Sequence, residues 1–480
     1  MSGQPKTLSA PSGMRGLQPP LVRPVGIMGP SAAMATVIIA GFVLPISLVP
    51  SSRGFYFSYP LLPAVWWKTN LVVPFAVIAL LVRPIQGSIG IISHPTLRWF
   101  LFPFLFLGFW QILSLFWNDQ NGYMKSYSLV QSIYMLCAIT GAVLITSGRA
   151  FLSRIELGKQ LVFILAFIFS VYLGLSFVFP SWRPSSAFMD HTASSLGFIR
   201  MFGPLGKSTT LLLILLPCLG FCIGMLSIPG RSKLLWMLMS GFFIFATFAT
   251  GSRGSVLCLG AFVLCLMAAL RHRAIWFVFP SGLVVLLIVA VFGVPERFQN
   301  FEDQSRFQTY ATALRAFSAS AEHVAFGTGH GQLYSTLHDN TERKMLQRPR
   351  WYLLDDRNEY GYTLRSSHTA ILRPLAETGI IGFTFASIPL VWILKRLLLP
   401  KTRIGKCRYG LHATCALSGC AATIPYLALD EFFVSSFWVV VLWCTFVVIA
   451  AESQWDADMA RQIHGPGMFK PTGTNAVRSA

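Results

Sequence analysis

Charged side chains are scarce in this 480-residue chain. Asp, Glu, Lys and Arg together make up 12% of it, and hydrophobic residues make up 54%. A typical soluble domain carries about 25% charged residues. The mean hydropathy is +0.60. This composition excludes an ordinary soluble enzyme and predicts membrane spans of about 20 apolar residues each.

Acidic residues are rarer than basic ones, and recognisable metal or redox motifs are lacking. The chain has 18 Asp and Glu against 38 Lys and Arg, and its 9 cysteines form no CxxC pair. That excludes the commonest zinc and disulfide-exchange motifs. Neither HxxxH nor HExxH occurs, so we expect no metal site, and we interpret His323 and His338 as ordinary loop histidines.

Apolar runs recur along the whole chain and indicate the fold class. Backbone groups in lipid must be hydrogen-bonded internally, so runs of this length predict helices. We expect an all-α polytopic membrane protein with about twelve transmembrane helices and a large extracytoplasmic loop that contains short helices. The expected spans lie near 29–50, 61–82, 99–117, 127–147, 161–180, 208–228, 234–250, 255–270, 274–294, 370–394, 411–429 and 432–450.

The distribution of Lys and Arg orients these spans. With a cytoplasmic amino terminus, most basic residues fall in inner loops, as the positive-inside rule requires. The basic residues of the inner loops then account for the high pI. We therefore expect no nucleic-acid partner. We expect disordered cytoplasmic tails at 1–26 and 451–480, nine transmembrane helices in 27–294, a periplasmic loop at 295–369 and three helices in 370–450.

The loop at 295–369 is long and polar, and loops of this length are usually functional or disordered. A helix within it is predicted by apolar side chains at helical spacing: Phe307, Tyr310, Leu314 and Phe317. A glycine cluster at 327–331 then predicts a turn. The segment 338–365 is charged and irregular, and we expect it to bear on acceptor choice.

Arginines gather on the outer face of the predicted bundle. Arg253 lies in a short turn between two spans, Arg306 starts the loop helix, and Arg365 lies shortly before His368. Arginine binds phosphate through paired hydrogen bonds and keeps its charge, so this convergence favours a site for a lipid diphosphate. A histidine at the edge of a span can accept a proton from a hydroxyl.

The start of the tenth span contains two further patterns. Glu377 follows Arg373 by four residues, a spacing that brings side chains together on one helix face, and we interpret this pair as structural. Gly379 and Gly382 are small residues at a spacing that allows close helix packing in membranes.

Taken in order, these motifs resemble the signature of the O-antigen ligase and polymerase superfamily over about residues 195–395. The pattern of His368-Thr369, nine residues, and Gly379-Ile380-Ile381-Gly382 is similar to its histidine motif, which usually has Asn, Ser or Gln where Thr369 stands. Three further segments are similar to its Ser-Arg-Gly turn, the start of its large periplasmic loop and its Arg-x-x-Gly entry to a span: Thr250-Gly251-Ser252-Arg253-Gly254, Arg306 with Gly327-Thr328-Gly329, and Arg200-Met201-Phe202-Gly203-Pro204.

The resemblance implies glycan transfer from undecaprenyl diphosphate to an acceptor hydroxyl, without metal or other cofactor. By analogy His368 activates or orients the acceptor hydroxyl, and Arg253 and Arg306 stabilise the departing diphosphate. The remaining substrate-binding candidates are Arg365, Arg200 and Gly329. The resemblance also implies a bacterial inner (plasma) membrane location with both termini cytoplasmic. Expected partners are the lipid-linked glycan donor, a glycan or lipid A–core acceptor, membrane lipids and other polysaccharide-assembly proteins.

Three enzyme activities are compatible with this resemblance, and they differ in their acceptor. A repeat-unit end makes the protein a polymerase of O-antigen or exopolysaccharide, lipid A–core makes it a ligase, and a protein hydroxyl makes it an oligosaccharyltransferase. We favour the polymerase slightly. The rival class is a multi-span transporter or a flippase of lipid-linked sugars, but the predicted spans carry few of the ionisable groups that coupling to protons or sodium requires.

Overall fold

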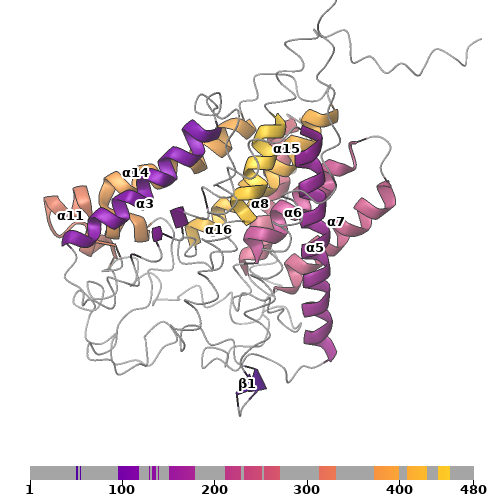
Figure 1. The fold of residues 1–480 in the computed structure, drawn as a ribbon, viewed down its shortest axis with the longest axis horizontal. Helices are drawn as coiled ribbons and strands as arrows, with labels where there is room; N and C mark the ends of the chain where they lie inside the picture. The colour runs from indigo at the N-terminus through magenta and orange to yellow at the C-terminus, as the bar shows by residue number, and fades with distance from the viewer. Residues whose placement is uncertain are drawn as a thin grey trace, which may run out of the picture.

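The computed structural model describes part of the chain, shown as coloured ribbon in Figure 1. The described residues are 50–51, 54–55, 96–117, 129, 132–133, 135–136, 139, 151–178, 211–228, 232–250, 253–270, 313–330, 372–398, 408–429 and 442–454. Among them the structure is nearly all helical, as predicted. The exception is a minimal antiparallel pair of strands, β1 (Pro50–Ser51) and β2 (Gly54–Phe55).

Most helices coincide with the expected spans. Their bounds are η2 Leu97–Leu101, α3 Phe102–Ser114, η3 Leu115–Trp117, α5 Phe151–Val178, α6 Leu212–Met225, α7 Lys233–Ala249, α8 Arg253–Leu270, α11 Ala321–Phe326, α14 Leu372–Leu398, α15 Arg408–Ala421, α16 Ile424–Leu429 and an unlabelled helix Leu442–Gln454. The expected spans 61–82 and 274–294, and nearly all of 29–50, lie outside the described residues.

Two of the described helices are long and apolar enough to cross a membrane, namely Arg98–Trp117 and Leu372–Leu398. At 1.5 Å per residue, a helix of 20 residues is about 30 Å long, the thickness of the hydrocarbon core of a bilayer. Four shorter apolar helices accompany them: Leu212–Met225, Lys233–Ala249, Gly254–Ala269 and Leu442–Gln454. The total of twelve spans remains a prediction.

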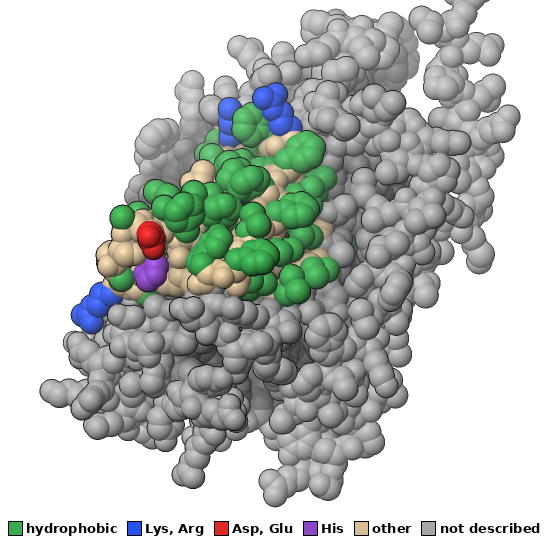
Figure 2. Space-filling model, turned by 60° about the vertical axis from the view of Figure 1, so that its left-hand side comes forward, with side chains coloured by type: hydrophobic (Ala, Val, Ile, Leu, Met, Phe, Trp, Pro, Cys, Tyr) green, Lys and Arg blue, Asp and Glu red, His purple; other side chains and the backbone are tan. Residues whose placement is uncertain are grey.

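One face of α3 and α14 exposes large apolar side chains, which form the green band in Figure 2. Phe116 is 83% exposed and Phe109 is 60% exposed, whereas Phe104 and Leu107 on the other side of the helix are fully buried. An apolar surface this extensive is unusual on a soluble monomer. It matches a helix that contacts lipid on one side and protein on the other.

The helices form two groups that lie side by side (Figure 1). In one, α3 packs along α14, and α11 lies against α14. In the other, α6 packs against α15 through glycines: a Cβ on Gly220 or Gly419 would overlap the backbone of the facing helix. Small residues that allow helix backbones to approach closely are typical of membrane bundles.

The helix α5 begins at Phe151, well before the expected start near 161. Its first turns contain a buried ion pair, in which Arg154 Nη1 lies 3.0 Å from Glu452 Oε2. Glu452 itself lies in the helix Leu442–Gln454, which extends into the first residues of the expected tail. The pair joins two segments that the charge bias assigns to the same side of the membrane.

Candidate functional site

Gly379 interrupts α14 shortly after the helix begins. Its φ of 65° and ψ of −169° lie in a region that is essentially restricted to glycine. The interruption divides α14 into a first segment, residues 372–378, and a longer second segment, residues 380–398. In a continuous helix the carbonyls of residues 376, 377 and 378 accept hydrogen bonds from residues 380, 381 and 382, so the break makes them available to other donors.

Three N–H groups from outside the helix bind these carbonyls. Two are backbone amides of the predicted glycine-rich turn, and the third is an indole N–H of α3. The bonds are Thr328 N to Ala376 O at 2.8 Å, Gly329 N to Glu377 O at 3.0 Å, and Trp110 Nε1 to Thr378 O at 3.0 Å. Buried carbonyls rarely stay without a donor, so the turn and α3 complete the end of the first segment.

The turn reaches this position because local signals define it. Ser320 accepts a hydrogen bond from His323 N and caps the start of α11. Gly327 ends α11 with a φ of 78° and a ψ of 179°, a backbone region essentially restricted to glycine. A Cβ at Gly327 would overlap the Glu377 carbonyl, and one at Gly379 would overlap the Ala325 carbonyl. The two backbones therefore require glycine on both sides.

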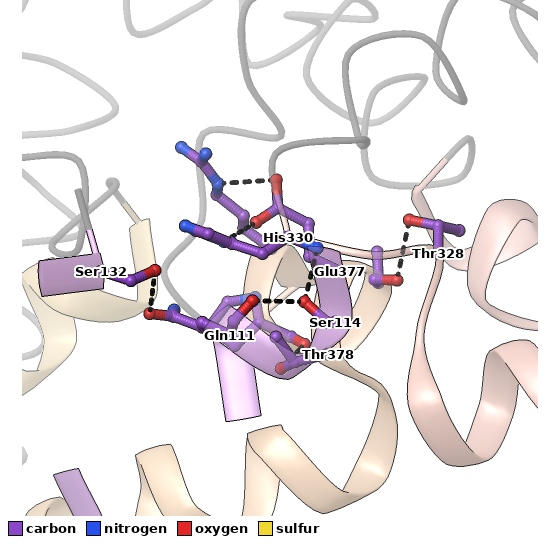
Figure 3. Close-up of polar contacts among 10 residues, drawn as sticks. Gln111, Ser114, Ser132, Thr328, His330, Glu377 and Thr378 are labelled. Atoms are coloured by element: carbon purple, nitrogen blue, oxygen red, sulfur yellow. Dashed lines mark hydrogen bonds and ion pairs between the residues drawn. The ribbon is translucent and has the colours of Figure 1, made fainter. Parts of the chain in front are cut away.

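A buried cluster of three ionisable side chains lies at the same place (Figure 3). His330 Nδ1 lies 2.9 Å from Glu377 Oε2, and Arg373 Nε donates to Glu377 Oε1 at 3.0 Å. Glu377 is 2% exposed, and His330 and Arg373 are each 5% exposed. A carboxylate acts only as an acceptor, so in this cluster each oxygen of Glu377 receives its own donor.

The end of α3 adds a polar contact to His330. The His330 amide donates to Ser114 Oγ at 2.8 Å, and Ser114 Oγ donates to the Gln111 carbonyl at 2.8 Å. Ser132 Oγ lies 3.4 Å from Gln111 Oε1. His330 is therefore held from two directions, by α14 through its ring and by α3 through its backbone.

Aromatic side chains from α3, η3 and α11 pack together beside the cluster. Phe326, the last residue of α11, stacks on Trp110 with ring centroids 6.0 Å apart and meets Trp117 edge-on at 6.2 Å. Trp110 also contacts Trp117, at 5.9 Å. These rings join α11 to α3 beside Thr378, whose carbonyl accepts a hydrogen bond from Trp110.

The structure places only part of the sequence-predicted site. Gly329 lies in the turn with a φ of 104°, and Arg253 is the first residue of α8. The other candidates lie outside the described residues: His368, Arg306, Arg365 and Arg200. Along the chain, His368 precedes the first residue of α14 by four positions.

The Arg373–Glu377 pair is confirmed, but the participation of His330 was not predicted. Its partner is 47 residues away along the chain. The available signal was its place in the cluster Gly327-Thr328-Gly329-His330-Gly331. Among the described residues, no group of three or more His, Cys, Asp or Glu side chains is arranged to hold a metal ion.

Comparison with known proteins identifies the region that contains this cluster. Residues 238–387 match the family model described as O-Antigen ligase. No curated protein matches the chain. The matched region begins within α7, includes the glycine-rich turn and the three charged residues, and ends in the second segment of α14. Over this region the chain is similar to the O-antigen ligase family, as the sequence motifs predicted.

Proposed function

We propose that this chain transfers a glycan from undecaprenyl diphosphate to an acceptor hydroxyl at the periplasmic face of the bacterial inner membrane. The observation that carries the proposal is the O-Antigen ligase match, because 238–387 contains Arg253, Arg306 and His368 together. The apolar helices on either side of the loop support a membrane setting.

In the proposed reaction the acceptor oxygen attacks the anomeric carbon of the donor sugar. The bond between that carbon and the diphosphate oxygen breaks, and its electron pair leaves with the lipid diphosphate. The hydroxyl proton passes to His368, a general base of the type most common in enzymes. Arg253 and Arg306 stabilise the negative charge that develops on the leaving diphosphate.

The remaining candidates bind substrate in this scheme: Arg365 and Arg200 contact the diphosphate, and Gly329 lies in the turn that borders the donor. The donor is already activated by its diphosphate, so the scheme uses no metal or cofactor. The acceptor is a repeat-unit end in a polymerase, which we favour, or lipid A–core in a ligase. Other polysaccharide-assembly proteins are the proposed partners.

The proposal is tested in a deletion strain that expresses wild type, His368→Ala, Arg253→Ala or Arg306→Ala. Arg315→Ala is the matched control, because Arg315 is an exposed arginine of the same loop. We expect each of the first three variants to lower surface or secreted polysaccharide by at least about 100-fold, the usual contribution of an acid–base or electrostatic group. Arg315→Ala retains the wild-type product.

The polysaccharide is resolved by size, and membrane abundance is checked by immunoblot. Loss of long chains identifies a polymerase, and loss of core-linked chains identifies a ligase. A full product profile from His368→Ala contradicts the assignment of the base. A flippase is distinguished by purified protein in liposomes, which then moves the lipid-linked glycan across the bilayer without forming a glycosidic bond.

A further inference from the structure

We propose that His330 and Glu377 are positioning residues of this enzyme. They fix the glycine-rich turn, residues 327–330, and the first segment of α14, residues 372–378, in one arrangement. This inference rests on the proposed function, because the segment they hold is the one that follows His368 along the chain. Neither residue is assigned a contact with substrate.

The first segment of α14 depends on contacts from outside the helix. It contains seven residues, roughly two turns, and isolated helices shorter than about 12–15 residues are marginal in water. The break at Gly379 separates it from the second segment. Its last three carbonyls accept hydrogen bonds from the turn and from α3, so these two elements determine its direction.

Glu377 connects this backbone arrangement to side chains. Its carboxylate is 2% exposed and receives Arg373 on one oxygen and His330 on the other. Removing one partner of a buried charged group is strongly unfavourable, because the charge that remains is poorly compensated. The ring of His330 and the amide of His330 therefore tie α14, the turn and α3 together at one residue.

The position of His368 depends on the first segment of α14 because the two are joined by a short stretch of chain. His368 precedes Leu372 by four positions, so their Cα atoms lie within about 14 Å of each other. A tilt of the first segment displaces every residue attached to it. A displacement of about 1 Å at a reacting group can cost about 100-fold in rate.

The distinguishing variant is His330→Asn. The amide nitrogen of Asn occupies the place of Nδ1 and can donate to Glu377 Oε2, but it cannot titrate. A positioning role is therefore restored by Asn, whereas an acid–base role is not. His323→Ala is the matched control, because His323 is another histidine of the same loop, half-buried, and its ring contacts the Ala316 carbonyl.

The experiment measures kcat and KM of the full chain in nanodiscs with a polyprenyl-diphosphate-linked glycan and an acceptor glycan. We expect His330→Ala and Glu377→Gln to lower kcat by about 10- to 100-fold, with the donor KM changed by less than about threefold. His330→Asn recovers at least half of the loss on a logarithmic scale. His323→Ala stays within about twofold of wild type. Melting temperatures in the same nanodiscs identify any variant that fails to fold.

Two results contradict the inference in an enzyme that is otherwise active. The first is wild-type kcat in a folded His330→Ala. The second is a folded His330→Asn as inactive as His330→Ala. If wild type is active, His368→Ala is inactive and His330→Ala is normal, only the positioning role fails. If wild type forms no glycosidic bond, the proposed function fails and the positioning role fails with it.

Discussion

Gly379 is the residue on which the geometry of the charged cluster depends. Its positive φ ends the first segment of α14 and frees the carbonyls that the glycine-rich turn binds. Its missing side chain leaves room for the carbonyl of Ala325. A single glycine thus provides both the backbone conformation and the close approach that bring His330 to Glu377.

We expect Gly379→Ala to destabilise the protein by at least about 1–3 kcal/mol, the cost of placing a non-glycine residue in this backbone region. The overlap with Ala325 adds to this cost. Thermal unfolding in detergent measures the effect, and limited proteolysis measures release of the loop. The control is Gly241→Ala in α7, where an added Cβ meets no atom within 4 Å. Equal melting temperatures for the two variants contradict the prediction.

The sequence made part of this residue-scale picture predictable. The spacing of Arg373 and Glu377 was sufficient to predict their pairing, because neighbours on one helix turn are set by local geometry alone. The small residues Gly379 and Gly382 correctly indicated close packing. The contact with His330 joins residues that are 47 positions apart along the chain. Local sequence patterns do not predict contacts over such a separation.

At the scale of elements, charged residues near helix ends were the main source of error. Arg154 and Lys159 suggested an inner loop before α5, yet both lie within the helix. Arg154 is buried because Glu452 from a distant helix neutralises it. Lys159 instead pairs locally with the half-exposed Glu156 at 2.7 Å. Apolar periodicity gave the cores of the helices, whereas their ends depended on partners far along the chain.

The two ion pairs of α5 should differ in strength. We expect Arg154→Ala to destabilise the protein by about 3–5 kcal/mol, because it leaves Glu452 buried with its charge poorly compensated. Lys159→Ala should cost at most about 1 kcal/mol, since its pair with Glu156 is accessible to solvent.

Denaturant unfolding of the purified protein measures both changes. The double variant Arg154→Met with Glu452→Leu should recover most of the stability, because apolar side chains of similar size replace the pair without leaving a charge. A double variant less stable than Arg154→Ala contradicts this account.

At the scale of the whole molecule, exposed charged side chains lie at the two ends of an exposed apolar face, as expected for helices that cross a membrane. Arg98 and Lys395 are exposed and lie along the chain next to Phe100 and Trp392, whose rings meet at one end of α3 and α14. Glu322 is exposed in α11, which packs at the other end of α14, and the exposed Arg315 lies shortly before α11 in the chain. Figure 2 shows charged side chains at both ends of the apolar face. The positive-inside rule predicts that the first end faces the cytoplasm. With this proposed orientation, the charged cluster around Glu377 lies at the periplasmic end.

This orientation predicts the labelling of introduced cysteines in intact cells. Cys407 lies in a basic stretch between two expected spans, so it is first replaced by Ser to remove its thiol. In this background a membrane-impermeant thiol reagent should label Arg315→Cys and leave Lys395→Cys unlabelled until the cells are opened. Both positions are exposed, so access to the reagent depends on the side of the membrane. The reverse pattern contradicts the orientation, and mass spectrometry reads the result.

The contact between His330 and Glu377 has a further consequence for the segment 331–371. The ends of this segment are anchored beside each other, at His330 and at Leu372 in the turn before Glu377. The entropy of closing a loop grows only slowly with its length. We therefore expect changes in the length of this segment to leave the helices that flank it in place.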